Sequence, residues 1–128
     1  MQAGFSQDKS IYVQISELIE NNVLRDIFLE EERVPSTNEF SKMYSINPAT
    51  AAKGINRLVE EGILYKKRGI GMFVAAGAKE KIRMRRKNEF YDNYVRKMME
   101  EARSLGITSE ELIEMIEKNE NREDRNDD

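Results

Sequence analysis

Residues 35–74 read PSTNEFSKMYSINPATAAKGINRLVEEGILYKKRGIGMFV, a stretch in which capping and turn signals separate short apolar patterns. Ser36 and Glu39 have the spacing of a capping box, in which each side chain satisfies a backbone N–H of the other residue. This spacing predicts a short helix over residues 37–44. The side chains that this helix is expected to bury are Phe40 and Met43.

A second helix is predicted directly after a tight connection at residues 44–46. Asn47 is a good N-cap, and Pro48 suits the first helical position, where its missing N–H costs nothing. Gly62 is typical of the left-handed residue that follows a helix, so we expect the helix to run to about Glu61. Its expected inner stripe is Ala51, Ile55, Leu58 and Val59.

The remaining elements of residues 1–76 complete a recognisable order. Residues 63–67 and 72–74 read as strands joined by the glycine-rich loop 68–71, which predicts a hairpin. Upstream, residues 10–27 show a helical stripe, and Arg33 and Val34 a short strand. The polar face expected for that first helix is Glu17, Glu20 and Asn21. The order predicts an α+β winged helix-turn-helix of three helices and a β-hairpin wing.

The C-terminal part is predicted to be a small all-α region of two helices. Residues 79–105 contain no Pro or Gly and predict one long helix, which Gly106 ends; the capping-box pattern at 108–111 begins the last one. The expected organisation is a winged helix over 1–76, a two-helix region over 79–118, and an acidic, disordered tail over 119–128.

Two helices of this size cannot bury their apolar stripes on each other, so we expect a homodimer held by the C-terminal region. The expected dimerisation residues are Phe90, Tyr91, Tyr94, Val95, Met98, Ala102, Leu105, Leu112, Ile113 and Ile116. Alternatively, the long helix folds back on the first domain of the same chain.

The composition of the 128 residues excludes several function classes, because it includes no Cys and no His. Disulfides, thiolate nucleophiles and the commonest general base and metal ligand are therefore absent, which argues against a metal or proton-transfer enzyme. We expect no enzyme, cofactor or metal. The absence of Cys is typical of a reducing cytoplasm, where we expect the protein to lie. The apolar runs are short, which predicts no signal peptide and no membrane span.

The formal net charge of −3 hides an uneven distribution. Residues 1–78 hold nine basic and ten acidic side chains, residues 79–87 hold six and one, and residues 88–128 hold six and thirteen. A near-neutral first domain is therefore followed by a basic helix start and an acidic end.

The chain resembles the GntR family of transcription regulators, and within it the small YtrA subfamily. The resemblance rests on IYVQISELIE (11–20), VPSTNEFSKMYSINPATAAKGINRLVEEGILY (34–65) and KKRGIGMFV (66–74), which stand in family order and at family spacing. It implies a dimeric, sequence-specific DNA-binding regulator, with repression of an inverted-repeat operator as the expected mode and transporter operons as frequent targets. It also implies a short, dimerising C-terminal region of two helices.

The resemblance places the second helix of the helix-turn-helix in the major groove of double-stranded DNA, with its N-terminal turn facing base edges. Asn pairs with adenine, Ala and Thr contact a thymine methyl, and Lys reaches guanine or phosphate. The start of the preceding helix suits a phosphate, and a glycine-tipped wing approaches the backbone or minor groove. The expected DNA-binding residues are Asn47, Pro48, Ala49, Thr50 and Lys53 in the groove, Ser36, Thr37 and Asn38 before it, and Lys66, Lys67, Arg68, Gly69 and Gly71 in the wing.

Several alternatives stay open on the residues alone. Residues 79–87 either contact DNA beside the half-site or pair with acidic residues of the last helix, such as Glu110, Glu111 and Glu114, across a dimer. Tyr91 and Tyr94 are candidates to line a pocket for an unidentified effector, although aromatic residues at helical spacing are usually core. Two other functional classes are a winged-helix protein-interaction module without a specific DNA site and a carboxylate- or Lys-dependent enzyme.

Overall fold

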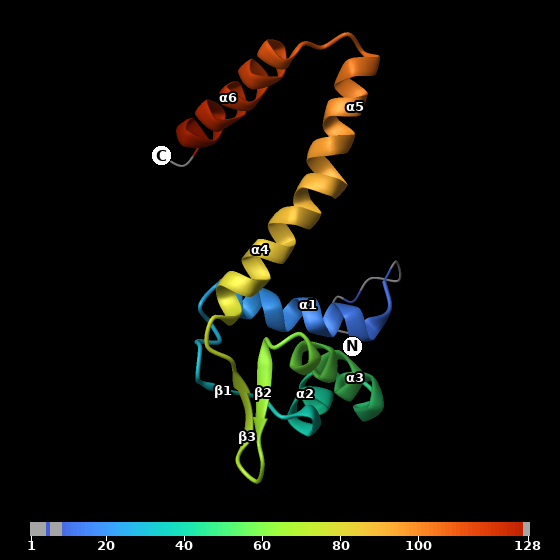
Figure 1. Cartoon of the computed structure of the whole chain (residues 1–128), viewed down its shortest axis with the longest axis vertical. Coiled ribbons are helices and arrows are strands. Elements are labelled where there is room, and N and C mark those ends of the chain that lie inside the picture. Colours follow the sequence, from blue (N-terminus) through green and yellow to red (C-terminus); the bar gives the residue numbers. More distant parts are fainter. Residues whose placement is uncertain (1–4, 6–8, 127–128) are drawn as a thin grey trace. The chain divides into compact units, whose positions relative to one another are not determined.

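The computed structural model describes residue 5 and residues 9–126, in two compact units of which the first ends at Arg85 and the second begins at Arg86 (Figure 1). The elements of the first unit are α1 (Ile11–Leu24), β1 (Arg33–Val34), α2 (Thr37–Tyr44), α3 (Pro48–Glu60), β2 (Leu64–Lys67), β3 (Gly71–Val74) and the first turns of α4 (Ala78–Phe90). This order confirms the predicted winged helix-turn-helix.

Helix α1 packs its apolar stripe into the core but is shorter than predicted. It ends at Leu24 instead of Ile27, because Asp26 adopts a φ of 61° and the N–H groups of Ile27 and Phe28 donate back to the Asn22 carbonyl. This left-handed turn closes the helix in the way that glycine usually does.

The assignment of Glu20 to the polar face of α1 was wrong. Glu20 is only 2% exposed, and its carboxylate accepts a hydrogen bond from the guanidinium of Arg85. A buried carboxylate needs such a partner, and this one lies 65 positions along the chain, where helical periodicity gives no sign of it.

The capping signals of α2 and α3 are confirmed. The Ser36 hydroxyl accepts from the Glu39 N–H, and the Asn47 carboxamide oxygen accepts from the Ala49 N–H at 2.8 Å. The expected burial of Met43 was wrong, since this side chain is 62% exposed whereas Phe40 is buried. At about 100° per residue, Met43 lies about 110° from the middle of the face that Phe40 and Ser41 bury, and it therefore faces outward.

The sheet is antiparallel in the order β1-β3-β2, with Tyr65 opposite Phe73 and Arg33 on the other side of Phe73. Val34, Leu64 and Val74 turn their side chains into the core formed with α1, α2 and α3. The predicted hairpin between residues 63 and 74 is therefore present as β2 and β3.

The first unit extends beyond the expected end of the winged helix at residue 76. Ala78 and Ile82 of α4 are fully buried in its core. The first two turns of α4 thus belong to the winged-helix unit, because they close the core beside α1 and the sheet.

The second unit continues α4 through a π-helical turn (Tyr91–Val95) into α5 (Arg96–Ser104), and ends with α6 (Ser109–Asn126). Gly106 has a φ of 71°, and Thr108 and Glu111 form the predicted capping box. The π-helical turn was not predicted. The expected disordered tail is helical as far as Asn126, consistent with a stretch free of Pro and Gly; residues 127–128 lie outside the described part.

Candidate nucleic-acid interface

The N-terminal turn of α3 presents small side chains on an exposed surface. Pro48 and Ala49 are exposed and Thr50 is half-buried. The Asn47 cap uses the carboxamide oxygen and leaves the amide N–H groups as donors. This turn can approach base edges closely because no long side chain stands in front of it.

Lys53 extends from the next turn of α3 over an aromatic ring. Its ammonium lies 4.1 Å from the centroid of the Tyr12 ring, which comes from the first turn of α1. Both residues line an open groove with Ala49, Ala52, Asn56, Arg57 and Glu60. The sequence interpretation did not include Tyr12, because the contact joins two helices that are far apart in the chain.

The carboxylate of Glu39 already binds at the N-terminus of α2. The Glu39 side chain accepts from the Ser36 N–H at 3.4 Å and from the Arg33 guanidinium at 3.2 Å. Thr37 is half-buried and Asn38 exposed. Of the three residues expected to hold a phosphate here, Ser36 serves the cap, and Asn38 is the one whose side chain faces outward.

The wing displays the expected cations at its tip. Lys66, Lys67, Arg68 and Gly69 are exposed, and Gly69 has a φ of 79°. Gly71 differs from this expectation: it is half-buried, and a Cβ there would lie 2.7 Å from the Arg33 Nε. Gly71 therefore makes room for Arg33.

Aromatic side chains on β2 and β3 support the cations of the wing. The rings of Tyr65 and Phe73 stack at 5.8 Å, and the Lys67 ammonium lies 4.5 Å from the centroid of Phe73. The Tyr65 hydroxyl donates to the Glu31 carboxylate at 2.6 Å. This hydrogen bond, together with desolvation and the negative charge of Glu31, raises the pKa of Tyr65.

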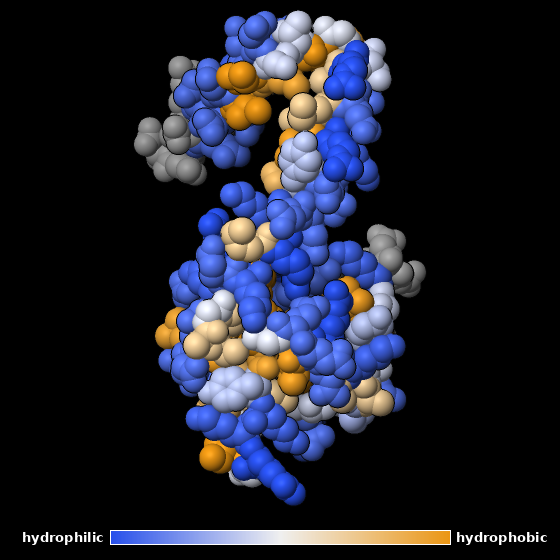
Figure 2. Space-filling model, in the orientation of Figure 1, coloured by the Kyte–Doolittle hydropathy of each residue, from blue (hydrophilic) through white to orange (hydrophobic). Residues whose placement is uncertain are grey.

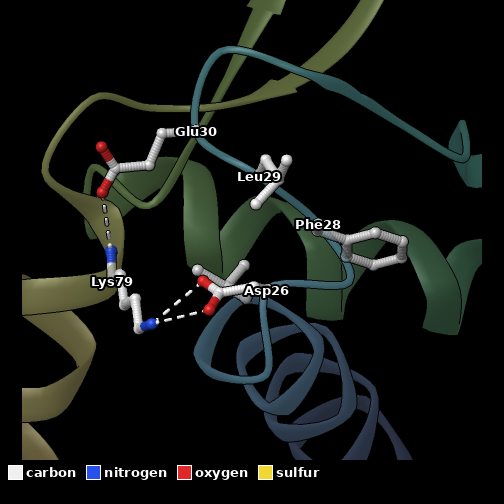
Figure 3. Close-up of a pocket in the computed structure, with 6 residues that line it drawn as sticks. Asp26, Phe28, Leu29, Glu30 and Lys79 are labelled. Atoms are coloured by element: carbon white, nitrogen blue, oxygen red, sulfur yellow. Dashed lines mark hydrogen bonds and ion pairs between the residues drawn. The ribbon is translucent and has the colours of Figure 1, made fainter.

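Two cations of the basic stretch 79–87, Lys79 and Arg85, form ion pairs with acidic residues earlier in the first unit, an arrangement that neither sequence interpretation included. The Lys79 ammonium contacts both oxygens of Asp26, at 2.9 and 3.1 Å, and its backbone N–H donates to Glu30 (Figure 3). Arg85 binds Glu20 and Glu61. The start of α4 is therefore held to α1, to the loop after it and to the end of α3.

The second unit leaves most of the expected dimerisation residues uncovered, and hydrophobic surface is visible on α5 and α6 in Figure 2. The exposed ones are Phe90, Tyr91, Tyr94, Met98, Leu105, Ile113 and Ile116. Val95 and Leu112 are half-buried. Ala102 is only 4% exposed because its own chain already covers it, so it offers little surface to a second copy.

Within residues 5 and 9–126, no group of three or more Asp and Glu side chains is arranged to hold a metal ion. No helix of this described part is long and apolar enough to cross a membrane.

A capped recognition helix beside α2, with a cationic hairpin wing, defines the class of winged helix-turn-helix DNA-binding proteins. The sequence pattern described as "Bacterial regulatory proteins, gntR family" matches residues 11–74. The chain belongs to the GntR family of transcription regulators, as the resemblance implied.

The similarity to individual members extends over nearly the whole chain. The chain is 30% identical over 118 residues to the HTH-type transcriptional regulator YhcF of Bacillus subtilis, covering 91% of this chain and 94% of that one. It is 27% identical over 106 residues to the HTH-type transcriptional repressor YtrA of the same organism, covering 83% and 81%. Homologues therefore include YtrA.

Two solved structures are similar to the chain. A GntR-family regulator from Bacteroides thetaiotaomicron is 33% identical, with a TM-score of 0.78 over 89% of this chain and 99% of that one. The DNA-binding domain of AraR, solved in complex with an operator, is 30% identical, with a TM-score of 0.51 over 59% and 92%. The GntR family and this fold make the chain a DNA-binding transcription regulator.

Proposed function

We propose that the chain is a repressor that binds an inverted-repeat operator in double-stranded DNA as a homodimer. The observation that carries this proposal is the recognition helix: an exposed, capped turn at Pro48 and Ala49 with Lys53 beside it, next to a cationic wing. Repression is favoured by the similarity to YtrA, which is named a repressor.

In this mechanism the start of α3 enters the major groove. Asn47 donates its amide hydrogens to a base edge, Ala49 and Thr50 contact a thymine methyl, and Lys53 binds guanine or phosphate. Lys66, Lys67 and Arg68 bind backbone phosphates beside the groove, and Gly69 allows the wing to approach closely. Asn38 contributes from the start of α2.

The dimer contact is assigned to the second unit and a second copy of this chain. Tyr94 and Leu105 are 66% and 65% exposed, and Ile113 is 53% exposed. A pair of helices cannot bury such side chains on itself, whereas a second copy offers an equal apolar surface. Two-fold symmetry in the protein then demands two-fold symmetry in the operator.

The resemblance to the YtrA subfamily favours a transporter operon as the target. As a bacterial-type regulator the protein acts in the cytoplasm, where the promoter lies. No catalysis and no cofactor enter this function. Tyr91 and Tyr94 are the candidates to line a pocket for a small-molecule effector.

The second candidate function is a winged-helix protein-interaction module, which is favoured by the apolar character of Pro48 and Ala49. Selection of bound duplexes from a random pool at near-physiological salt tests both. We expect an enriched inverted repeat. The absence of any enriched motif would support the interaction module, and protection of one asymmetric half-site by a dimer would contradict the symmetric arrangement.

A further inference from the structure

Arg85 joins two carboxylates from different helices at the end of the first unit. One amino group of its guanidinium contacts Glu20 of α1, and the other lies 2.7 Å from Glu61, the residue that ends α3. The Glu20 side chain is 3% exposed, while those of Arg85 and Glu61 are 34% and 33% exposed. Since the pairs are partly buried, salt screens them less than it screens surface pairs.

The cluster formed by Arg85, Glu20 and Glu61 is important because of the helices that it connects. Glu61 caps the recognition helix, and Arg85 is the last residue of the first unit, one turn of α4 beyond the buried Ile82. The guanidinium thus ties the end of the recognition helix to the helix that carries the chain into the second unit. Arg57 extends the cluster back along α3, with its Nε 3.4 Å from Glu61.

We propose that Arg85 is a positioning residue that determines which spacing between operator half-sites the protein accepts. The inference rests on the proposed function, in which the second unit joins two copies. The separation and rotation of the two recognition helices then depend on the direction in which each α4 leaves its winged helix. Ala78 and Ile82 fix the first turns of α4 by packing, and Arg85 fixes the next turn against α1 and α3.

Spacing is a sensitive measure of this direction. One added base pair between half-sites rotates one of them by about a tenth of a helical turn and moves it along the axis. A rigid connection accepts one spacing and loses simultaneous binding at its neighbours, whereas a loose one tolerates several. Base preference within a half-site depends on α3 and the wing, so the two properties are separable.

The test compares variants on a library in which two fixed half-sites are separated by random spacers of different lengths. The main variant is Glu20→Gln with Arg85→Gln, because removing the cation alone would take the Arg85 charge away from a buried carboxylate. Arg83→Gln controls for the lost cation: it removes a positive charge from the same helix as Arg85→Gln does, but Arg83 pairs with the exposed Glu80. Arg85→Lys tests rescue by a conservative change, and thermal unfolding confirms that each variant folds.

We expect the wild type and Arg83→Gln to prefer one spacing about tenfold over its neighbours, and the double variant to lose most of that preference. Its half-site base preference should stay as in the wild type, and Arg85→Lys should recover part of the spacing preference. A folded double variant with the wild-type spacing profile would overturn the inference alone. A wild type that enriches no inverted repeat would overturn the proposed function and this inference with it.

Discussion

The Lys53 ammonium lies 4.1 Å above the ring of Tyr12, so that α1 supports a cation of the recognition helix. The quadrupole of an aromatic ring holds a cation over the face of the ring. A lysine side chain that is already held in this way loses less conformational entropy when it binds DNA. We therefore expect Tyr12 to act on DNA binding by positioning Lys53.

Two substitutions distinguish the effect of the Lys53 charge from the effect of the Tyr12 ring that supports it. Lys53→Gln should weaken operator binding and, if the lysine binds phosphate, flatten the log-log salt slope by about 0.9. Tyr12→Leu should weaken binding by less and leave the slope unchanged, because the cation is retained. Fluorescence anisotropy across a salt series measures both effects. Lys118→Gln, an exposed lysine of α6, serves as the control, and equal losses for all three variants would contradict a specific role for the pair.

Helix α3 crosses α1 so closely that only glycine fits at position 54. A Cβ there would lie 2.6 Å from the Tyr12 carbonyl oxygen and 3.0 Å from the Ile15 Cβ, and the Ser16 hydroxyl donates to the Gly54 carbonyl at 2.7 Å. Gly54→Ala should destabilise the fold by about 1–3 kcal/mol through overpacking, partly offset by about 0.5–1 kcal/mol of helix propensity.

Thermal unfolding measures this cost, which corresponds to about 4–8 °C per kcal/mol for a domain of 60–100 residues. Asn56→Ala lies on the exposed side of the same helix and should leave Tm nearly unchanged. If Gly54→Ala raised Tm, the contact between the two helices would have to be looser than described.

Substitution by alanine should lower the stability of the fold by different amounts at the two glycines of the wing. At Gly69, with a φ of 79° and open space around it, alanine should cost about 1–2 kcal/mol, for its left-handed conformation alone. At Gly71 a φ of 147° is combined with a Cβ position 2.7 Å from the Arg33 Nε, so alanine should cost more.

Displacement of Arg33 at Gly71→Ala should also disturb its pair with Glu39 at the start of α2. Denaturant unfolding of both variants compares their costs. Equal destabilisation at the two positions would show that Arg33 moves aside freely.

The hydrogen bond between Tyr65 and Glu31 predicts a pH dependence. It raises the pKa of Tyr65 in the folded protein above the value of about 10 expected in the unfolded chain. The stabilisation is therefore fully present below pH of about 10 and is lost as pH rises through the raised folded pKa.

Spectrophotometric titration of tyrosine, with Tyr65→Phe subtracted from the wild type, isolates this residue. Glu31→Gln should lower the pKa of Tyr65 toward its ordinary value, since both the negative charge and the charge-assisted hydrogen bond are removed. The stability advantage of the wild type over Tyr65→Phe should be present near neutral pH and shrink at alkaline pH. An unchanged titration in Glu31→Gln would contradict the hydrogen bond as the cause.

Capping and turn residues close together in the sequence predicted the helices and strands of the first unit. The features that were not predicted depend on contacts between residues far apart in the chain. The caps at Ser36 and Asn47 depend on residues at most three positions away, so their chemistry is readable in the sequence. The burial of Glu20 depends on Arg85, and the placement of Lys53 depends on Tyr12.

The C-terminal half shows the same division. The helix stop at Gly106 and the cap at Thr108 are local and were predicted. The π-helical turn over Tyr91–Val95 inserts one residue into the helical repeat without Pro or Gly, so composition gives no sign of it. Whether a given apolar residue is covered by its own chain, as Ala102 is, depends on the packing around α5 and cannot be read from a stripe.

The exposed apolar side chains of the second unit predict that self-association can be broken without unfolding the winged helix. Leu105→Glu and Ile113→Glu place a charge on side chains that are 65% and 53% exposed in the single chain, so neither should disturb the fold. If these side chains are central to the contact, each substitution should cost about 2 kcal/mol of dimer stability, which weakens association about thirtyfold.

Sedimentation equilibrium of the wild type and both variants measures the dissociation constant, with Glu101→Gln on α5 as a control at an exposed polar position. Binding to a paired operator should weaken together with dimerisation, whereas binding to an isolated half-site should not change, because α3 and the wing are untouched. Variants that stay dimeric would move the contact away from these two residues, and a wild type that is monomeric at micromolar concentration would contradict the homodimer.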